Sequence, residues 1–161
     1  MNGWKEDKAW SDKLLPEIKQ ILGLYLIGEA PECEDCERNT DLIVLKMEPV
    51  RIACRIRRYR YFSSYPDDIT IRAERPSGMK SELTKIIEGW GNYFFYGFAT
   101  EDERRLAGWK LCDLNAFRLY FNRKIIKTGL LPGMERKNGD GSSVFRVFRA
   151  VDIPNFVVKQ G

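Results

Sequence analysis

Residues 40–61 read TDLIVLKMEPVRIACRIRRYRY and predict two neighbouring strands joined by a turn. The first strand, residues 42–47, is almost continuously apolar, which is typical of a strand covered on both faces. The second, residues 50–61, alternates between apolar residues on one face and mostly arginine or tyrosine on the other. Asp41 stands at the head of the first strand. The pattern therefore predicts an acid-tipped strand beside a strongly basic one.

The charges of the chain are sorted into segments. The net charge is only +4, but residues 29–37 hold five acids and no base, and residues 51–60 hold five arginines and no acid. Charge sorted in this way produces local fields that the net value conceals. One interpretation is a surface that binds a polyanion. The other is that both segments are solvated faces.

The composition is that of a folded globular chain. The 161 residues are 43% hydrophobic and 31% charged, which predicts a single domain with a sizeable core over residues 1–161. No apolar run approaches the roughly 20 residues that span a bilayer. The first residues lack the basic-then-apolar layout of a secretory signal. We therefore expect a cytoplasmic location and no membrane partner.

Histidine is absent from the chain. Its absence excludes Ser-His-Asp and Cys-His catalysis, nucleases that bind their metal through histidine, and Cys/His zinc fingers. Any general acid or base must then be Asp, Glu, Lys, Tyr or Cys.

The rest of the chain alternates between helical and extended patterns. Apolar residues recur at helical spacing or at every second position, and Gly and Pro separate the segments. A glycine-rich loop is expected over residues 129–141 and an irregular tail from Pro154. We predict an α/β fold in which helices flank a mixed central sheet. The helices are expected over residues 10–27, 77–90, 100–105 and 115–127, and further strands over residues 69–74, 93–98, 109–114 and 144–148.

The order of the elements up to residue 98, with Asp41 at the head of a strand, resembles the PD-(D/E)XK superfamily of restriction-endonuclease-like nucleases. Members of that superfamily share an α-β-β-β-α-β core, with an aspartate on one strand and a Glu-x-Lys motif on the next. The resemblance implies that the three strands form a meander. It also implies a nuclease-like core over about residues 11–98 and a C-terminal extension over about residues 99–161.

The second strand departs from the motif of that superfamily. The Glu position falls near Ala53 or Arg55, and the Lys position near Arg55 or Arg57. Arginine stays protonated and presents only donors, so it binds phosphate but cannot bind a metal ion. The catalytic motif is therefore predicted to be degenerate or rearranged.

The resemblance leaves carboxylates from other elements as candidate metal ligands. It implies that Asp41 and Glu17 hold a metal ion, with Glu74 on an adjacent strand as the candidate for the missing carboxylate. In one outcome, Asp41 and Glu17 pair with Arg55 and Arg57 in an ionic network, and no cation binds. In the other, Asp41 with Glu17 or Glu74 holds one Mg²⁺ while one of these arginines acts on the scissile phosphate.

The basic strand also predicts contacts with nucleic acid. Guanidinium groups bind phosphates through two parallel hydrogen bonds, and tyrosine rings stack on bases. The alternative is that these arginines pair with carboxylates such as Glu74 or Asp67. The residues expected to bind nucleic acid are Arg51, Arg55, Arg57, Arg58, Tyr59, Arg60, Arg72 and Arg75.

Four cysteines raise the question of zinc. Cys33 and Cys36 have the spacing of half a zinc site, which Cys54 and Cys112 would complete. However, Cys54 and Cys112 are isolated on apolar strands, where a buried small hydrophobe is the commoner role. The acids around the first pair disfavour redox activity because they raise the thiol pKa. We expect no zinc at Cys33 and Cys36.

The leading prediction is a nucleic-acid-binding protein with a nuclease-like core and a degenerate or rearranged catalytic motif. The expected nucleic acid is DNA, and the expected cofactor is either none or Mg²⁺. One alternative is an active Mg²⁺-dependent deoxyribonuclease that uses Asp41, Glu17 or Glu74 and either Arg55 or Arg57. Another is a non-catalytic protein-interaction module whose acidic and basic segments dock a partner.

Overall fold

The chain forms both helices and strands. The computed structural model describes residues 3–23, 27–29, 42–44, 50–75, 77–139, 141 and 143–161. The helices are α1 (Gly3–Asp12), α2 (Leu15–Gly23), α4 (Tyr59–Ser64), α5 (Glu82–Ile87) and α6 (Leu114–Thr128), with a 3-10 turn at Ala150–Asp152. The strands are β1 (Ile27–Glu29), β2 (Leu42–Val44), β3 (Ile52–Arg57), β4 (Asp68–Glu74), β5 (Tyr93–Ala99), β6 (Leu106–Asp113), β7 (Met134–Lys137), β8 (Val144–Arg149) and β9 (Val157–Gln160).

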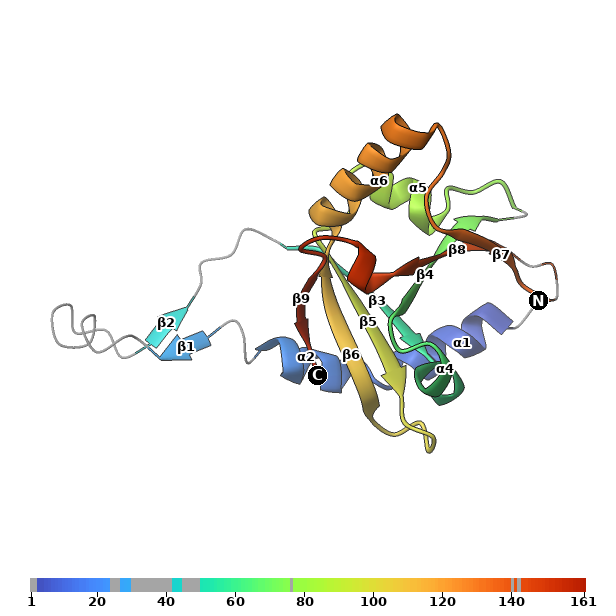
Figure 1. The fold of residues 1–161 in the computed structure, drawn as a ribbon. Coiled ribbons are helices and arrows are strands. Elements are labelled where there is room, and N and C mark those ends of the chain that lie inside the picture. The colour runs from blue at the N-terminus through green and yellow to red at the C-terminus, as the bar shows by residue number, and fades with distance from the viewer. Residues whose placement is uncertain are drawn as a thin grey trace, which may run out of the picture.

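Two sheets form the body of the molecule (Figure 1). A four-stranded mixed sheet has the order β3-β5-β6-β9, with β3 and β5 parallel and the other neighbours antiparallel. A three-stranded antiparallel sheet has the order β4-β8-β7. β1 and β2 pair only with each other, away from both sheets. The predicted α/β class with a mixed sheet is confirmed.

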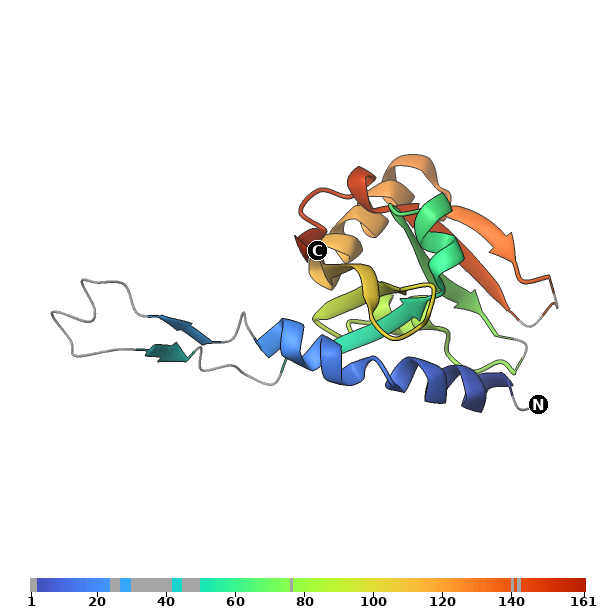
Figure 2. The ribbon, with the colours of Figure 1, turned by 90° about the horizontal axis from the view of Figure 1, so that it is seen from below.

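Strand β5 lies in the interior of the mixed sheet, and its aromatic residues pack on both faces of that sheet. Phe94, Tyr96 and Phe98 point into the main core and are at most 1% exposed. Phe95 faces the opposite side, where its ring stacks on Trp109 at 5.5 Å between centroids. Helices α1 and α2 run end to end along the molecule next to β3 (Figure 2). β5 is therefore buried on both faces, and its aromatic run lies in the interior of the sheet.

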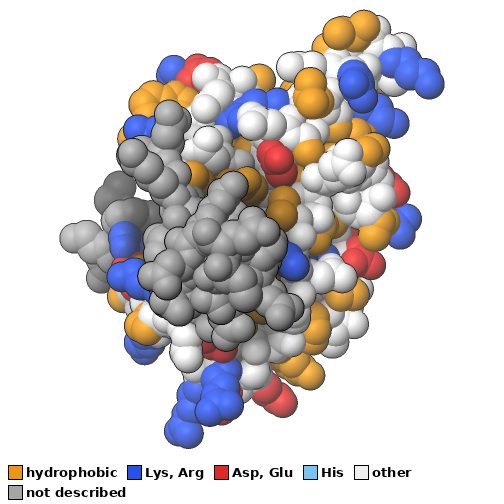
Figure 3. Space-filling model, turned by 90° about the vertical axis from the view of Figure 1, so that its left-hand side faces the viewer, with side chains coloured by type: hydrophobic (Ala, Val, Ile, Leu, Met, Phe, Trp, Pro, Cys, Tyr) orange, Lys and Arg blue, Asp and Glu red, His pale blue; other side chains and the backbone are white. Residues whose placement is uncertain are grey.

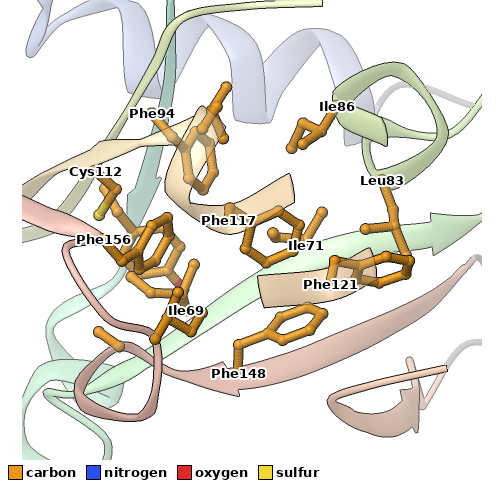
Figure 4. Packing of buried hydrophobic residues seen from close by; sticks show 14 of the residues in the cluster. Ile69, Ile71, Leu83, Ile86, Phe94, Cys112, Phe117, Phe121, Phe148 and Phe156 are labelled. Atoms are coloured by element: carbon orange, nitrogen blue, oxygen red, sulfur yellow. The ribbon is translucent and has the colours of Figure 1, made fainter. Parts of the chain in front are cut away.

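The main core is built from phenylalanines of several elements (Figure 4). Phe117 and Phe121 come from α6, Phe148 from β8, and Phe156 from the segment before β9. The rings of Phe117 and Phe148 meet edge-on at 4.9 Å between centroids, a favoured geometry for aromatic pairs. Asp113 caps α6 by accepting hydrogen bonds from two backbone N–H groups of its first turn.

The predicted meander of three strands is wrong. β2 pairs with β1, β3 pairs with β5, and β4 pairs with β8, so no two of these three strands are neighbours in a sheet. The physical reason lies in α4, which follows β3 directly and leads the chain out of the first sheet into the second. β3 therefore stays at the edge of the mixed sheet. Asp41 lies outside the described residues.

The predicted strand 50–61 ends at Arg57, because the residues after it form α4. Tyr61 and Tyr65 are four residues apart, on one side of this turn, and Phe62 packs on Phe98 at 5.3 Å between ring centroids. The alternation of arginine and tyrosine extends beyond Arg57 in the sequence, but the strand does not. The packing of Phe62 on Phe98 outweighs this local pattern and favours the helix.

Other boundaries also differ from the prediction. The first helix begins at Gly3 and is split into α1 and α2, and α5 begins after its cap Ser81. Residues 100–105 form a turn and not the predicted helix. Glu103 has a φ of 57°, and a right-handed helix requires a negative φ. The predicted loop contains β7 and the predicted irregular tail contains β9. Both strands depend on pairing with distant residues, which local pattern does not reveal.

Gly108 of β6 fixes how close α4 approaches the sheet. A Cβ at this position would lie 2.7 Å from Cε2 of Phe62, closer than packing allows. We expect Gly108→Ala to lower the free energy of unfolding by about 2 kcal/mol, because overpacking displaces Phe62 and α4 with it. Urea titration measures this change. Gly139→Ala is the matched control, since a Cβ there meets no atom within 4 Å, and an equal loss in both variants would contradict the explanation.

Candidate nucleic-acid interface

Two cavities adjoin at the carboxyl end of β3. We name the first the aromatic cavity; it has a volume of about 440 Å³ and lies between α4 and strands β4, β5, β7 and β8. The second, the polar cavity, has a volume of about 590 Å³ and lies between α1, the edge strand β3 and the start of α5. Arg57 and Tyr61 line both cavities. Any ligand long enough to fill both would pass these two side chains.

Arg57 is held at this junction by Tyr61. Its guanidinium carbon lies 4.1 Å from the centroid of the Tyr61 ring, a cation–π contact that fixes the side chain and leaves its N–H groups available. Arg60 lies over the same ring at 4.9 Å. Within the described part of the chain, no carboxylate is within ion-pair distance of Arg57.

Two further arginines line the aromatic cavity from the second sheet. Arg136 comes from β7 and Arg149 from the end of β8, and both are exposed. Neither has a carboxylate partner among the residues that the structure describes. Together with Arg57, they place three positive charges around one cavity. An anion that enters it meets three guanidinium groups and one acid, Asp68, so the positive charge is in excess.

The wall of the aromatic cavity is largely apolar and aromatic. Tyr65 and Phe145 line it together with Tyr96, whose hydroxyl lies 2.9 Å from the hydroxyl of Thr70. The Thr70 backbone N–H also donates to Tyr96, at 3.3 Å. These buried hydroxyls satisfy each other, so the floor of the cavity is fixed before any ligand binds.

Asp68 is the acid of this cavity. It lies opposite Arg149 in the β4–β8 register, and its side chain has no hydrogen bond or ion pair within the described residues. Burial raises the pKa of Asp68, Arg149 opposes this rise, and the neighbouring Asp67 adds to it. A partly buried carboxylate that forms no hydrogen bond carries a cost in free energy. It therefore favours a ligand that donates hydrogen bonds to it.

The polar cavity is organised around a pair of opposite charges. Arg55 forms an ion pair with Glu82, with 2.6 Å between nitrogen and oxygen, and donates a hydrogen bond to the backbone oxygen of Thr70 at 3.0 Å. Glu82 also accepts from the backbone N–H of Arg72 at 3.0 Å, which joins α5 to β4. Arg55 is therefore neutralised in part, and its guanidinium is held in place across the end of two sheets.

A second cluster ties α1 to the turn between β5 and β6. Arg58 pairs with Glu103 and lies over the Trp10 ring, 4.3 Å from its centroid. The Trp10 ring N–H donates to Glu103 at 2.7 Å. The hydrogen bond from Arg58 lowers the pKa of Glu103, with burial opposing and Trp10 assisting. The cluster thus closes one end of the polar cavity.

Several predicted site residues lie at these cavities and others do not. Arg57 lines both, and Arg55, Arg58 and Arg72 line the polar one. Arg60 touches Tyr61, and the exposed Tyr59 packs near Phe62. The remaining predicted binders lie elsewhere along their strands: Arg51 before β3, exposed, and Arg75 after β4, with a buried Nε that has no described partner.

The candidate metal ligands are not seen together. Glu17 accepts a hydrogen bond from the backbone N–H of Leu106 at 3.1 Å and so attaches α2 to β6. Glu74 is exposed at the end of β4. Asp41 lies outside the described residues, as do Cys33 and Cys36. Within the ranges that are described, no three Cys, Asp or Glu side chains are placed to hold a metal ion.

The two remaining cysteines behave differently. Cys112 is fully buried, as predicted, and burial raises the pKa of its thiol to about 12. Cys54 is exposed and lines the polar cavity, so its predicted burial is wrong. The reason is that β3 is an edge strand. Both thiols are free.

The contribution of β7 and β8 was missed from sequence. The strand pattern of residues 144–149 puts Phe145, Val147 and Arg149 on one face, and these three do line the aromatic cavity. That alternation was the available signal. Nothing in it indicated that this face would meet the end of β3.

On one face of the molecule the described basic residues do not form a single patch. On the face in Figure 3, lysine and arginine side chains lie in separate groups with apolar and uncharged atoms between them. Arg118 is used internally and donates to the backbone oxygens of Ile86, Trp90 and Gly91. Arg146 donates in the same way to three carbonyls of residues 131–133. The cavities are thus the better candidate for an anion site.

No helix in the described ranges is both long and apolar enough to cross a membrane. Comparisons with protein-family models, with curated proteins and with solved structures found no match. The functional proposal therefore rests on the geometry of the two cavities.

Proposed function

We propose that the protein binds single-stranded nucleic acid along the two adjoining cavities. The observation that carries this proposal is the set of three arginines, Arg57, Arg136 and Arg149, that surround an aromatic cavity with one acid, Asp68, and form no ion pair with a described carboxylate. Guanidinium groups match phosphate oxygens in geometry and in charge. Positive grooves with aromatic side chains are typical of sites for single strands.

The arrangement suits a flexible strand better than a rigid duplex. Both cavities are concave, and they meet at Arg57 and Tyr61 on the edge of a sheet. A single strand can bend to place a phosphate at this junction while neighbouring nucleotides enter either cavity. A duplex presents its phosphates on a convex surface and its bases in pairs, out of reach of Tyr61 and Tyr65.

The pairing of Arg55 with Glu82 supports binding without cleavage. In the ionic-network outcome, Arg55 pairs with a carboxylate rather than acting on phosphate. Such a pair is present, although its acid, Glu82, was not among the expected ones. We therefore propose binding without cleavage. The nuclease-like core with a degenerate or rearranged catalytic motif stays a prediction.

A salt titration tests the proposal. A labelled single-stranded DNA is titrated with protein, with fluorescence anisotropy as the readout, and each contacted phosphate adds about 0.7 to the slope of log K against log salt. Three contacts predict a loss of roughly 20-fold in affinity between about 50 and 200 mM salt. Affinity that does not respond to salt would overturn the proposal. Gel analysis of the same DNA with Mg²⁺ distinguishes binding from cleavage, since shortened products would favour the deoxyribonuclease alternative.

Replacing Glu82 changes the affinity in the opposite direction from replacing an arginine. Glu82→Gln removes the charge that neutralises Arg55 in the polar cavity. We expect affinity for single-stranded DNA to rise several-fold at low salt, with the salt slope steeper by about 0.7 because one more cation is free to contact phosphate. Anisotropy at several salt concentrations measures both quantities.

Glu88→Gln is the matched control for this variant. Glu82 begins α5 and Glu88 caps its other end. Glu88 pairs with Lys80 and lines neither cavity. The control therefore removes one negative charge from the same helix. An equal gain in affinity from both substitutions would show that only net charge matters, and the polar cavity would lose its role.

A further inference from the structure

The aromatic cavity has the size and lining of a site for one nucleobase. Its volume of about 440 Å³ lies within the range of small-ligand sites, which runs from roughly 300 to 1,000 Å³. Phe98, Phe145 and Val147 give it an apolar wall, and Tyr61 and Tyr65 stand on one side of α4 at its margin. Flat apolar rings fit such a space by stacking.

The polar groups of this cavity are unequal in their capacity to bind a base. The hydroxyls of Thr70 and Tyr96 already bond to each other at 2.9 Å. The carboxylate of Asp68 has no such partner among the described residues, and it is the one acid among those lining the cavity. Discrimination between bases therefore falls to a group that can only accept hydrogen bonds when ionised.

Among the nucleobases, guanine complements a carboxylate best. Its Watson–Crick edge carries two adjacent donors, N1–H and the N2 amino group, which match the two oxygens of an ionised acid. Cytosine and adenine each present an amino group beside a ring nitrogen that accepts, and thymine and uracil present one N–H between two carbonyls. Unstacked bases of single strands are read on this edge.

We infer that the aromatic cavity takes one unstacked nucleobase and that Asp68 selects guanine there. The inference rests on the proposed binding of single-stranded nucleic acid. Arg57 stands where this cavity meets the polar one, so it contacts the phosphate next to the captured base. Arg136 and Arg149 lie at the exposed margin and neutralise phosphates on the other side.

The test uses oligothymidine strands that differ at one central nucleotide. That nucleotide is guanine, hypoxanthine, adenine or an abasic site, and affinity is measured by anisotropy at one salt concentration. We expect guanine to bind about tenfold more tightly than adenine, as a good bidentate pair discriminates. Hypoxanthine lacks the N2 amino group and is expected to fall between them. The abasic strand is expected to bind no better than adenine.

A variant series separates selectivity from general affinity. Asp68→Asn replaces one acceptor oxygen by a donor, so it is expected to abolish the preference for guanine over adenine and hypoxanthine. Asp67→Asn is the control, because Asp67 pairs with Lys110 at 3.7 Å and does not line the cavity. It is expected to retain the preference.

The outcomes distinguish this inference from the proposal beneath it. Salt-dependent binding with equal affinity for all four strands would overturn the guanine site and leave the proposed function standing. A preference for guanine that survives Asp68→Asn would overturn the role of Asp68. If no strand binds in a salt-dependent way, the proposed function fails, and the inference fails with it.

Discussion

The double variant Arg57→Gln/Arg149→Gln is expected to bind single-stranded DNA about 100-fold more weakly than the unchanged protein at low salt. A hydrogen bond to a charged group contributes about 1.5–3 kcal/mol, and each arginine is proposed to make at least one to phosphate. The salt slope is expected to fall by about 1.4, which is two contacts at about 0.7 each. Anisotropy across a range of salt concentrations measures both values.

The two arginines were chosen because they approach the aromatic cavity from different sheets. Arg57 ends β3 and is held by Tyr61, whereas Arg149 ends β8. Neither forms a described ion pair, so their replacement strands no acid within an existing salt bridge. We expect the free energy of unfolding to change by less than about 1 kcal/mol. A loss of affinity in this variant therefore reports on binding rather than on folding.

A control with the same loss of charge is available on α6. Arg123 and Lys127 are exposed on that helix and line neither cavity. Arg123→Gln/Lys127→Gln lowers the net charge by the same amount, and its effect is expected to stay within about threefold because solvent and salt screen distant charges. Equal losses from the two double variants would mean that the protein attracts DNA through its overall charge.

Much of the fold could be predicted where a local pattern reflects a local cause. Strands β4, β5, β6 and β8 and helix α6 lie close to their expected positions, because alternation and helical spacing both record which face is buried. The cap Asp113 and the left-handed Gly129, with φ of 68°, mark the ends of α6 within two residues of the prediction. Such signals need no knowledge of distant residues.

The failures share a long-range cause. β9 forms because residues near the end of the chain pair with β6, and Lys110 meets Gln160 across that pair. β3 pairs in parallel with β5, although 35 residues lie between Arg57 and Tyr93. The sequence of β3 therefore does not indicate which strand lies beside it. The short helix α4 decides which sheet the next strand joins. Its first residues, Tyr59, Arg60 and Tyr61, continue the alternation of β3.

Only half of the candidate site could be found from sequence for the same reason. Arg55, Arg57 and Arg58 stand out because they are clustered along the chain. Arg136 and Arg149 come from strands that only the fold brings to the end of β3. Composition also does not distinguish an arginine that binds a ligand from one with a structural role. Arg118 has a structural role, because it donates hydrogen bonds to backbone carbonyls.

Phe117→Ala is expected to lower the free energy of unfolding by about 3–5 kcal/mol, as is typical for a buried phenylalanine. The Phe117 side chain is 0% exposed, and its ring contacts those of Phe121, Phe148 and Phe156 with centroids 5.8, 4.9 and 5.8 Å away. Domains of this size are stable by roughly 5–15 kcal/mol, so the loss is a large part of the total. Urea titration measures it.

The control for this variant lies two residues further along the same helix. Leu119 of α6 is 58% exposed, so Leu119→Ala removes an apolar side chain from the surface and is expected to change stability by less than about 1 kcal/mol. The consequence for function follows from Phe148, which Phe117 supports and which lies next to Arg149 on β8. Loosening β8 moves an arginine of the aromatic cavity, so the same variant is expected to bind DNA more weakly even where it remains folded. Full stability or full affinity in Phe117→Ala would contradict the view that this core positions the cavity.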